Sequence, residues 1–481
     1  MTVGDRARRV AGTTVRLHAG RGAGREGHLH AGRGAGREGR RIPRADLVAA
    51  GAALGLVALA CLAGAALYLA GHPVHATSAP FTGNWLPHLG PGTPLALGVA
   101  AVVVWQGSRL AAVLPWRRLL ATAYVSAAAW IFSLALVDGW QRGLAGRLTT
   151  RHEYLSEVGG VTGVHAMLRG FAGRILDFQL DSWTTHVAGH PPGAFLVFIA
   201  LDRIGLGGGG WAAVACVAIG ALCAVAVPVT IRALGDEAAA RAAVPFLVLF
   251  PGAVWIGASA DGLFAGVTAT GLALLAVGLT GRSVAPAFAG GLLLGGGLYL
   301  SYGLVLLAVP ALAVVFLAAR SRPWPSLPLG AALAGVATVV VAFTLAGFWW
   351  LDGYHLVTVR YYQGIASVRP YAYWIWADLA LVFVCAGPAA AVILRRSALR
   401  QSAAGPGRLR PAVLLPAAAL LAILAADLSG YSKAEVERIW LPFAVWLMAG
   451  AALIPLPGRR FWLVAQAAVA LLVNHLLLTT W

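Results

Sequence analysis

Charged residues are scarce in this chain of 481 residues. Only 11% are Asp, Glu, Lys or Arg, against about 25% in an ordinary soluble domain. This scarcity excludes a soluble enzyme. Hydrophobic residues make up 59% of the chain, and long runs with few charges recur from Leu47 to Trp481. That composition is typical of a polytopic membrane protein.

Cysteine and lysine are also rare. The four cysteines, Cys61, Cys216, Cys223 and Cys385, all lie inside apolar runs and lack the spacing of a metal or redox motif. We therefore interpret them as packing residues. Lys433 is the only lysine beside 35 arginines. Because the composition so clearly prefers arginine, this rarity does not by itself mark a site.

The chain lacks a long polar segment. No stretch between its apolar runs exceeds about 75 residues, which is shorter than the roughly 100 residues of a usual soluble catalytic domain. A nucleotide-sugar-binding or ATP-binding domain is therefore excluded. Any chemistry has to use the membrane-embedded body and its loops.

Positive charge is concentrated at the N-terminus. The formal net charge is +18, and residues 1–44 hold 11 Arg and three acids, a net charge of +8. This tail contains a near-repeat, LHAGRGAGREGH at Leu17 and LHAGRGAGREGR at Leu29. We predict a disordered cytoplasmic tail, with binding to nucleic acid or anionic lipid as the disfavoured alternative. Without a signal-peptide pattern before Leu47, the first span is expected to be retained.

The apolar runs predict an all-α fold, a polytopic transmembrane helical bundle of about thirteen spans. The predicted regions are a tail (1–44), N-terminal spans (45–137), a large outer loop with interfacial helices (138–210) and a transmembrane bundle (211–481). The predicted spans are 47–70, 92–108, 118–137, 211–231, 242–257, 262–279, 285–300, 303–319, 326–348, 376–394, 411–427, 439–456 and 461–478.

Alternate crossings give this bundle a consistent orientation. With the tail inside, fifteen arginines fall on the cytoplasmic side of a cell membrane, as the positive-inside rule requires. They are Arg109, Arg117, Arg118, Arg232, Arg241, Arg282, Arg320, Arg322, Arg395, Arg396, Arg400, Arg408, Arg410, Arg459 and Arg460. Residues 193–206 must then lie at the outer interface or re-enter, because counting them as a span would reverse the orientation of every later span. Of 15 acids after residue 45, only Asp46, Asp236 and Glu237 face inward. The outer face is thus the predicted reaction side.

The large outer loop carries carboxylates and imidazoles beside aromatic anchors. A carboxylate at a partly dehydrated interface can act as a general base for a hydroxyl, or can bind a divalent cation. The alternative is a solvated loop with interfacial helices. The spacing of the two histidines does not specify a zinc site. The residues are Glu153, Glu157, Asp177, Asp181, His186 and His190.

Asp261 interrupts two apolar runs where the chain turns at the outer face. Ionisable groups at such a depth are costly and commonly functional. Asp261 also precedes Gly262 at a plausible helix start, so an N-terminal cap explains it equally well.

Basic residues in the last outer loops run against the positive-inside tendency. They could hold an anionic phosphate. Pairing with nearby acids, Glu435 and Glu437 among them, or snorkelling to lipid headgroups is an equal alternative. The basic residues are Arg360, Arg369, Lys433 and Arg438.

The order of these motifs resembles the GT-C class of polytopic glycosyltransferases, in particular the branch of protein O-mannosyltransferases and aminoarabinose transferases. The resemblance covers roughly residues 118–440. The motifs that carry it are Glu153-Tyr154, then His190-Pro191-Pro192-Gly193, then Phe250-Pro251 with Asp261, then Tyr299 with Ser301-Tyr302-Gly303.

The resemblance implies a transferase that uses a polyprenyl-phosphate sugar donor and an outer-face glycan, lipid or protein acceptor. Glu153 and Asp261 would be catalytic residues, and would hold Mg²⁺ or Mn²⁺ if a divalent metal takes part. The implied substrate-binding residues are Tyr154, His190, Tyr302, Arg369, Lys433 and Arg438, with the last three on the lipid phosphate.

The sequence departs from the family pattern at two places. His152 stands where the family often has Asp before Glu, so Glu157 and Asp181 are reserve candidates for the base, and two extra spans precede residue 118. A transporter or lipid flippase, or a non-catalytic membrane protein of the same fold, is the alternative. Transporters place coupling residues near the midplane in broken helices, whereas here the acids gather on one face.

Overall fold

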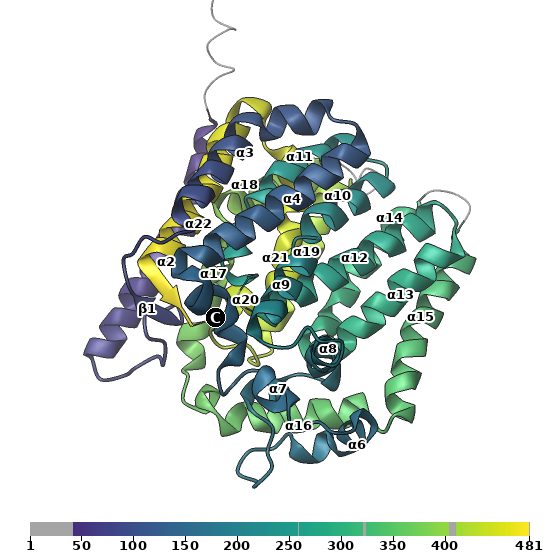
Figure 1. Cartoon of the computed structure of the whole chain (residues 1–481). Coiled ribbons are helices and arrows are strands. Elements are labelled where there is room, and N and C mark those ends of the chain that lie inside the picture. Colours follow the sequence, from purple (N-terminus) through teal and green to yellow (C-terminus); the bar gives the residue numbers. More distant parts are fainter. Residues whose placement is uncertain (1–41, 258, 321–323, 404–409, 481) are drawn as a thin grey trace, which may run out of the picture. The chain divides into compact units, whose positions relative to one another are not determined.

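The computed structural model describes residues 42–257, 259–320, 324–403 and 410–480, and these are almost entirely helical (Figure 1). The predicted tail, residues 1–44, lies almost wholly outside this part of the chain. Within it, the two named strands are β1 (Gly83–Trp85) and β2 (Leu477–Thr479), which pair antiparallel with Gly83 opposite Thr479. The predicted all-α class is confirmed.

Nine helical segments among the described residues are long and apolar enough to cross a bilayer. Each coincides with a predicted span, and the protein is a multi-pass membrane protein. The segments are α2 (Arg44–Leu69), α3 (Thr93–Val113), α4 (Trp116–Ala135) with its extension to Asp138, α9 (Gly209–Gly220) with α10 (Cys223–Ala233), α12 (Ala260–Thr280), the 3₁₀ turn Tyr302–Leu307 with α14 (Ala308–Ala319), α15 (Ser326–Leu345), α19 (Pro411–Leu428) and α22 (Leu456–Leu476).

Four predicted spans take other forms, so the number thirteen stays a prediction. Two coincide with short apolar helices, α13 (Val284–Leu300) and the segment Leu441–Leu453, which contains α21 (Leu441–Ala444). The predicted span 242–257 is divided between α11 (Glu237–Val248) and a 3₁₀ turn that begins at Pro251.

The fourth exception is a broken helix. α17 (Tyr371–Cys385) and α18 (Pro388–Ala403) meet at a bend of 104°. Gly387 has a φ of +76° there, and a Cβ on this residue would collide with the side chain of Gln466. Pro388 also lacks the N–H that would continue the first helix. Glycine and proline together therefore break the apolar run in two.

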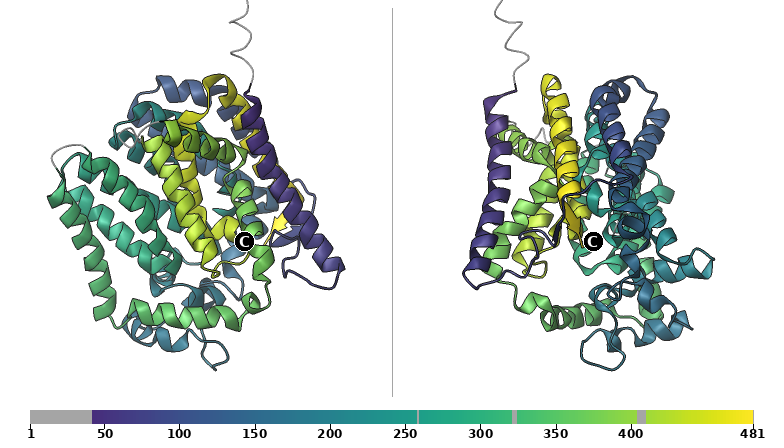
Figure 2. Two further views of the ribbon diagram at one scale, coloured as in Figure 1. Left: turned by 180° about the vertical axis from the view of Figure 1, so that it is seen from behind. Right: turned by 60° about the vertical axis from the view of Figure 1, so that its left-hand side comes forward.

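Small residues allow the central helices to pack closely. Gly291 on α13 lies against the backbone of Ala332 on α15, where a Cβ would meet the Ala332 carbonyl oxygen. Such contacts replace the hydrophobic driving force that is absent between helices in lipid. By contrast, α2 is mostly exposed, and both views in Figure 2 place it at the edge of the bundle.

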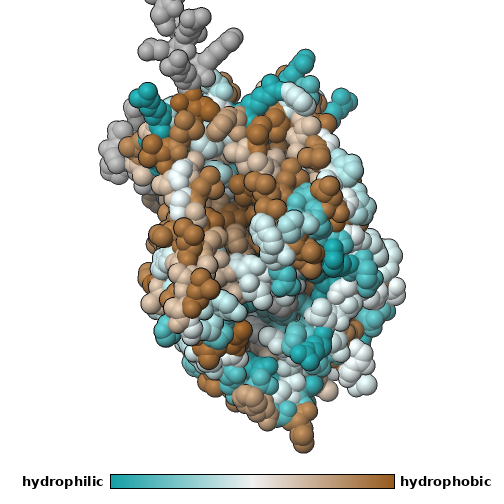
Figure 3. All heavy atoms as spheres, turned by 90° about the vertical axis from the view of Figure 1, so that its left-hand side faces the viewer, coloured by the Kyte–Doolittle hydropathy of each residue, from teal (hydrophilic) through white to brown (hydrophobic). Residues whose placement is uncertain are grey.

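The segments predicted to form the outer loops gather at one end of the bundle. Figure 1 shows α6 (Val164–Gly170), α7 (Thr185–Gly189) and α16 (Trp350–Gln363) together at the lower end. On the face drawn in Figure 3, apolar side chains cover the upper part and hydrophilic ones gather lower down.

Residues 193–206 mostly form α8 (Pro192–Arg203), whose 12 residues extend about 18 Å. That length is less than the thickness of a bilayer core, so this helix does not qualify as a span, in line with the prediction.

Candidate functional site

Charged side chains from four separate segments meet in what we call the charged cluster. Arg438, on α20 (Val436–Ile439), donates from Nη1 to Oδ2 of Asp261 at 2.7 Å and from Nη2 to Oε2 of Glu435 at 2.7 Å. Nη2 of Arg438 also lies 3.3 Å from Nε2 of His186, whose Nδ1 is 3.1 Å from Oε1 of Glu153. The two predicted catalytic carboxylates are thus linked through His186 and Arg438.

The members of the charged cluster are withdrawn from water. Glu153 is 3% exposed and Asp261 is 4% exposed, while Arg438 and His186 are also buried. Burying a charge is expensive unless it is paired and hydrogen-bonded. The fold therefore maintains a costly arrangement at its polar end, which is typical of a functional site.

Asp261 is not the N-terminal cap of its helix. The capping position of α12 is Ser259, and Asp261 lies in the first turn. A carboxylate there gains from the positive end of the helix dipole, but its direct partner is Arg438. The structure therefore contradicts the N-cap account of Asp261, while its catalytic role stays a prediction.

His186 connects the two halves of the cluster, and its contacts define its tautomer. Nδ1 faces two acceptors, the carboxylate of Glu153 and the backbone oxygen of His152 at 3.0 Å. Nε2 faces an N–H of Arg438. We therefore assign the proton to Nδ1, with Nε2 as the acceptor. The sequence pointed to His186 only as one of several polar residues in the outer loop; in the structure it lies on α7, which ends just before His190.

Tyr154 and His190, two of the predicted substrate-binding residues, lie beside the cluster. The Tyr154 ring stacks on Phe198 at 5.0 Å and lies 5.8 Å from that of His190. Burial, reinforced by Glu153 and Asp261, raises the pKa of Tyr154 well above its ordinary value. Burial also lowers the pKa of His190 to about 4. Both side chains are therefore neutral near pH 7, and the Tyr154 hydroxyl has no hydrogen-bond partner among the described residues.

Arg369 and Lys433 border the cluster through Glu435. Arg369 donates from Nη2 to Oε1 of Glu435 at 3.2 Å and from Nη1 to the backbone oxygen of Lys433 at 2.8 Å. Lys433 donates from Nζ to the backbone oxygens of Ala366 at 2.7 Å and Arg369 at 3.2 Å. Arg369 and Arg438 thus make the acid pairings that the sequence offered as an alternative, while Lys433 holds the loop that carries Arg369.

The structure does not bring every predicted site residue to the cluster. Tyr302 packs against α16, with its ring 5.5 Å from that of Trp350 and 6.2 Å from that of Tyr354. The reserve acid Glu157 accepts from the backbone N–H of Thr184 at 3.1 Å, and Asp181 lies 3.6 Å from Arg174. These acids stabilise the loop around α7.

The same loop is tied to α16 by a further ion pair. Arg360 on α16 pairs with Asp177 in the loop. Burial would raise the pKa of Asp177, but the hydrogen bond and charge of Arg360, together with the backbone N–H of Phe178, outweigh it and hold the pKa below its usual value. Arg360, one of the basic residues singled out in the sequence, therefore joins two segments that are predicted to be outer loops.

The carboxylates of the cluster are not arranged as metal ligands. In the described part of the chain, no three His, Cys, Asp or Glu residues are grouped so that they could hold a metal ion. Asp261 is paired with Arg438, and Glu153 faces His186. These residues therefore do not form a ligand set for the predicted Mg²⁺ or Mn²⁺.

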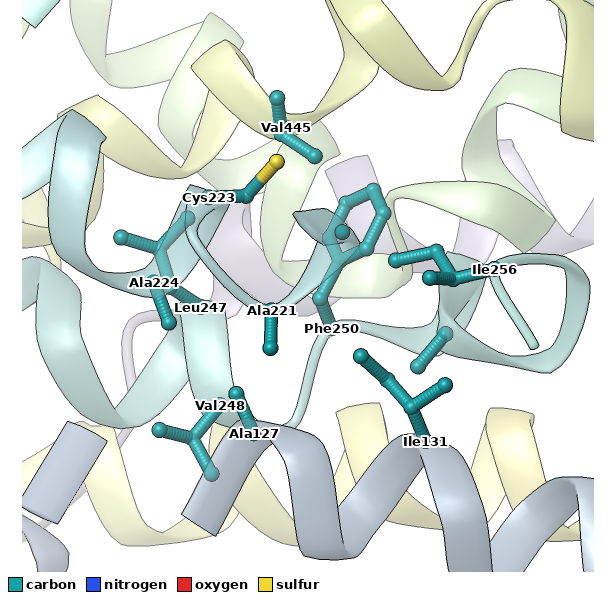
Figure 4. Close-up of a pocket in the computed structure, with 12 residues that line it drawn as sticks. Ala127, Ile131, Ala221, Cys223, Ala224, Leu247, Val248, Phe250, Ile256 and Val445 are labelled. Atoms are coloured by element: carbon teal, nitrogen blue, oxygen red, sulfur yellow. The ribbon is translucent and has the colours of Figure 1, made fainter. Parts of the chain in front are cut away.

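A small cavity of about 10 Å³ lies between α4, α10 and the 3₁₀ turn at Pro251 (Figure 4). Its lining is apolar and includes Ile131, Cys223, Phe250 and Ile256. A volume near that of one water molecule cannot accommodate a sugar. The cavity is a packing defect and plays no part in the charged cluster.

Glu437 is a buried acid next to the cluster, and we predict that it makes stability depend on pH. It is 2% exposed, its Oε2 has no hydrogen-bond partner among the described residues, and burial raises its pKa from 4.5 to about 7. The unfolded chain ionises near the ordinary value while the folded chain retains the proton. The folded state therefore loses stability as the pH rises from about 4.5 to about 7.

The measurement is thermal unfolding of the detergent-solubilised protein at several pH values. Glu437→Gln, which cannot ionise, should melt at a higher temperature than wild type at about pH 8 and at a similar temperature at about pH 4. A difference that is the same at every pH would show that Glu437 does not titrate in this window.

No family model and no curated protein matches this chain. Among solved structures, the crystal structure of ArnT from Cupriavidus metallidurans in the apo state is similar, with 20% sequence identity and a TM-score of 0.40. The match covers 69% of this chain and 60% of that chain.

Proposed function

We propose that this protein is a membrane glycosyltransferase that moves a sugar from a polyprenyl-phosphate donor to an acceptor hydroxyl at the outer face of the cell membrane. The observation that carries the proposal is the charged cluster. It unites the two acids of the motif order, Glu153 and Asp261, with Arg438 in one buried group. The acceptor hydroxyl belongs to a glycan, a lipid or a protein.

The shape of the described chain supports a lipid-linked donor. From residue 42 onward it forms one compact unit, and the segment between the spans on either side of the large loop, 139–208, consists of short helices. Within these residues there is no separate domain for a soluble nucleotide-sugar. An activated sugar delivered through the bilayer does not need such a domain. In this orientation the N-terminal tail would be cytoplasmic, by the positive-inside rule.

The cluster offers groups suited to a single displacement. Glu153 would accept the proton of the acceptor hydroxyl as that oxygen attacks the anomeric carbon. His186, donating from Nδ1, orients the Glu153 carboxylate. Arg438 would stabilise the charge on the departing polyprenyl phosphate. One displacement at the anomeric carbon implies inversion of its configuration.

The test is transfer from a panel of radiolabelled polyprenyl-phosphate sugars in membranes that contain wild type, Asp261→Asn or Asp352→Asn protein at equal expression. We expect transfer from at least one donor by wild type and by Asp352→Asn, because Asp352 is exposed on α16. Asp261→Asn should lose most transfer, because the charge that orients Arg438 is removed. No transfer from any donor, with native acceptors present, would contradict the proposal.

A second candidate, a transporter or lipid flippase, is favoured by one observation. The broken pair α17–α18 contains the buried Asp378, and α19 contains the buried Asp427. Transporters use acids near broken helices. If the donor panel gives no transfer, movement of a fluorescent polyprenyl phosphate across proteoliposomes that contain the protein would support this candidate.

A further inference from the structure

Glu435 bridges two buried arginines. Its Oε1 accepts from Nη2 of Arg369 at 3.2 Å, and its Oε2 accepts from Nη2 of Arg438 at 2.7 Å. Burial would raise the pKa of Glu435, but the guanidinium groups of Arg438 and Arg369 outweigh it and hold the pKa below its ordinary value. The carboxylate is therefore ionised, and it occupies the position that any small oxyanion would take between the two guanidinium groups.

Among the other carboxylates of the described chain that bridge two arginines, Glu237 and Asp46 show what is unusual about Glu435. Glu237 contacts Arg232 at 3.0 Å and Arg241 at 2.8 Å, with a side chain that is 44% exposed. Such exposed bridges contribute little and need no further explanation.

The other bridge is completely buried. Asp46 on α2 pairs with Arg395 at 2.5 Å and Arg396 at 2.6 Å on α18, and its side chain is 0% exposed. It lies in the first turn of a regular helix, so no unusual backbone conformation is needed to place it. This bridge joins two helices, and its carboxylate is closed to water.

Glu435 differs from both in its backbone and its access. Ala434 and Glu435 have φ angles of 69° and 63°, so two successive residues other than glycine adopt the left-handed conformation. Such backbone is strained and clusters at ligand sites and switch regions. The Glu435 side chain is 15% exposed, against 7% for each arginine side chain. The carboxylate is thus the part of the bridge that water reaches most easily.

We propose that Arg369 and Arg438 form a binding site for a phosphate group, and that Glu435 fills this site as a resident anion until a phosphate displaces it. This inference rests on the proposed function only for the identity of the natural ligand, the phosphate of a polyprenyl-phosphate donor or product. Displacement lets the strained turn at Ala434–Glu435 relax, and the incoming oxygens take over the two guanidinium contacts. Glu435 thereby supplies a counter-charge to Arg369, and a second one to Arg438 beside that of Asp261, when no phosphate is bound.

The test measures binding to purified full-length protein in detergent, with farnesyl phosphate, farnesol and inorganic phosphate as probes. Glu435→Gln removes the competing charge and keeps the side-chain volume. We expect it to bind farnesyl phosphate about tenfold more tightly than wild type. This factor corresponds to a wild-type site from which Glu435 is displaced for about a tenth of the time. Farnesol should bind both proteins equally. A gain with inorganic phosphate as well would mean that the headgroup alone suffices, whereas a gain confined to farnesyl phosphate would assign the site to a lipid.

Glu237→Gln is the matched control, because it removes a carboxylate from between two arginines on the surface. It should leave the binding of farnesyl phosphate at the wild-type value. Arg369→Gln should weaken this binding in the wild-type and Glu435→Gln backgrounds alike. If Glu435→Gln does not fold, Glu435→Asp decides the question, because its shorter side chain can reach one arginine and should give a smaller gain.

Farnesyl phosphate binding that is unchanged or weaker in the folded Glu435 variants would overturn the proposal and leave Glu435 as a structural bridge. The assay needs no sugar transfer. Tighter binding without any transferase activity would therefore support the phosphate site while the glycosyltransferase proposal fails. Sugar transfer without tighter binding would support the glycosyltransferase and contradict the phosphate site.

Discussion

Glu153→Gln is expected to lower the rate of sugar transfer by about 10²–10⁴-fold, the usual contribution of a positioned general base. The amide keeps the size of the side chain and can still accept from Nδ1 of His186, but it cannot take up a proton from the acceptor hydroxyl. The measurement is the initial rate in membranes with saturating donor. Because the loss concerns the chemical step, we expect kcat to fall while the KM for the donor changes little.

Two further variants sharpen this result. Glu237→Gln makes the same chemical change at an exposed site and should transfer at the wild-type rate. Glu157→Gln tests the reserve acid, whose carboxylate accepts from the backbone N–H of Thr184. If Glu157→Gln loses transfer while Glu153→Gln retains it, the base has been assigned to the wrong carboxylate.

Arg438→Gln is expected to destabilise the protein by about 3–5 kcal/mol, the cost of removing one partner from a buried ion pair. Asp261 and Glu435 would each lose a charged hydrogen bond at 2.7 Å. Transfer should also be lost, because the departing phosphate would lack its counter-charge. Thermal unfolding in detergent measures the first effect, and the donor panel measures the second.

A double-mutant cycle separates the two roles of Arg438. Adding Asp261→Asn to Arg438→Gln removes the carboxylate that the first change leaves unpaired, so part of the lost stability should return. Transfer should stay absent in the double variant. A folded Arg438→Gln protein with wild-type stability and wild-type transfer would show that the pair with Asp261 contributes neither to stability nor to sugar transfer.

The membrane architecture follows closely from the sequence, because lipid demands long apolar helices and these leave a clear hydropathy signal. Where the signal does not report the form of a span, the cause is local chemistry inside an apolar run. The run 376–394 looks like one span, yet Gly387 and Pro388 bend it by 104°. Hydropathy averages over such residues, whereas the fit of Gly387 against Gln466 depends on a helix that is distant in the chain.

The charged cluster was only partly predictable. Glu153 and Asp261 stood out because they are acids at the ends of apolar runs. His186 and Glu435 were only two among several polar loop residues, because the contacts that distinguish them join residues far apart in the chain: His186 lies 252 residues before Arg438, and Glu435 lies 66 residues after Arg369. Tyr302 shows the opposite case, since its place in the motif order suggested the site while its ring packs against α16. Sequence order alone does not report which side chains converge.

The pairing of β1 with β2 has a consequence for how the protein is assembled. Gly83 pairs with Thr479, and Arg147 in the large loop donates to the backbone oxygen of Thr479 as well as to Asp138. Gly83 and Arg147 can therefore make these contacts only after Thr479 has been synthesised. Contacts of such long sequence separation form slowly. Until the chain has been synthesised through α22 and β2, it therefore exposes the polar edge formed by Arg147 and Asp138.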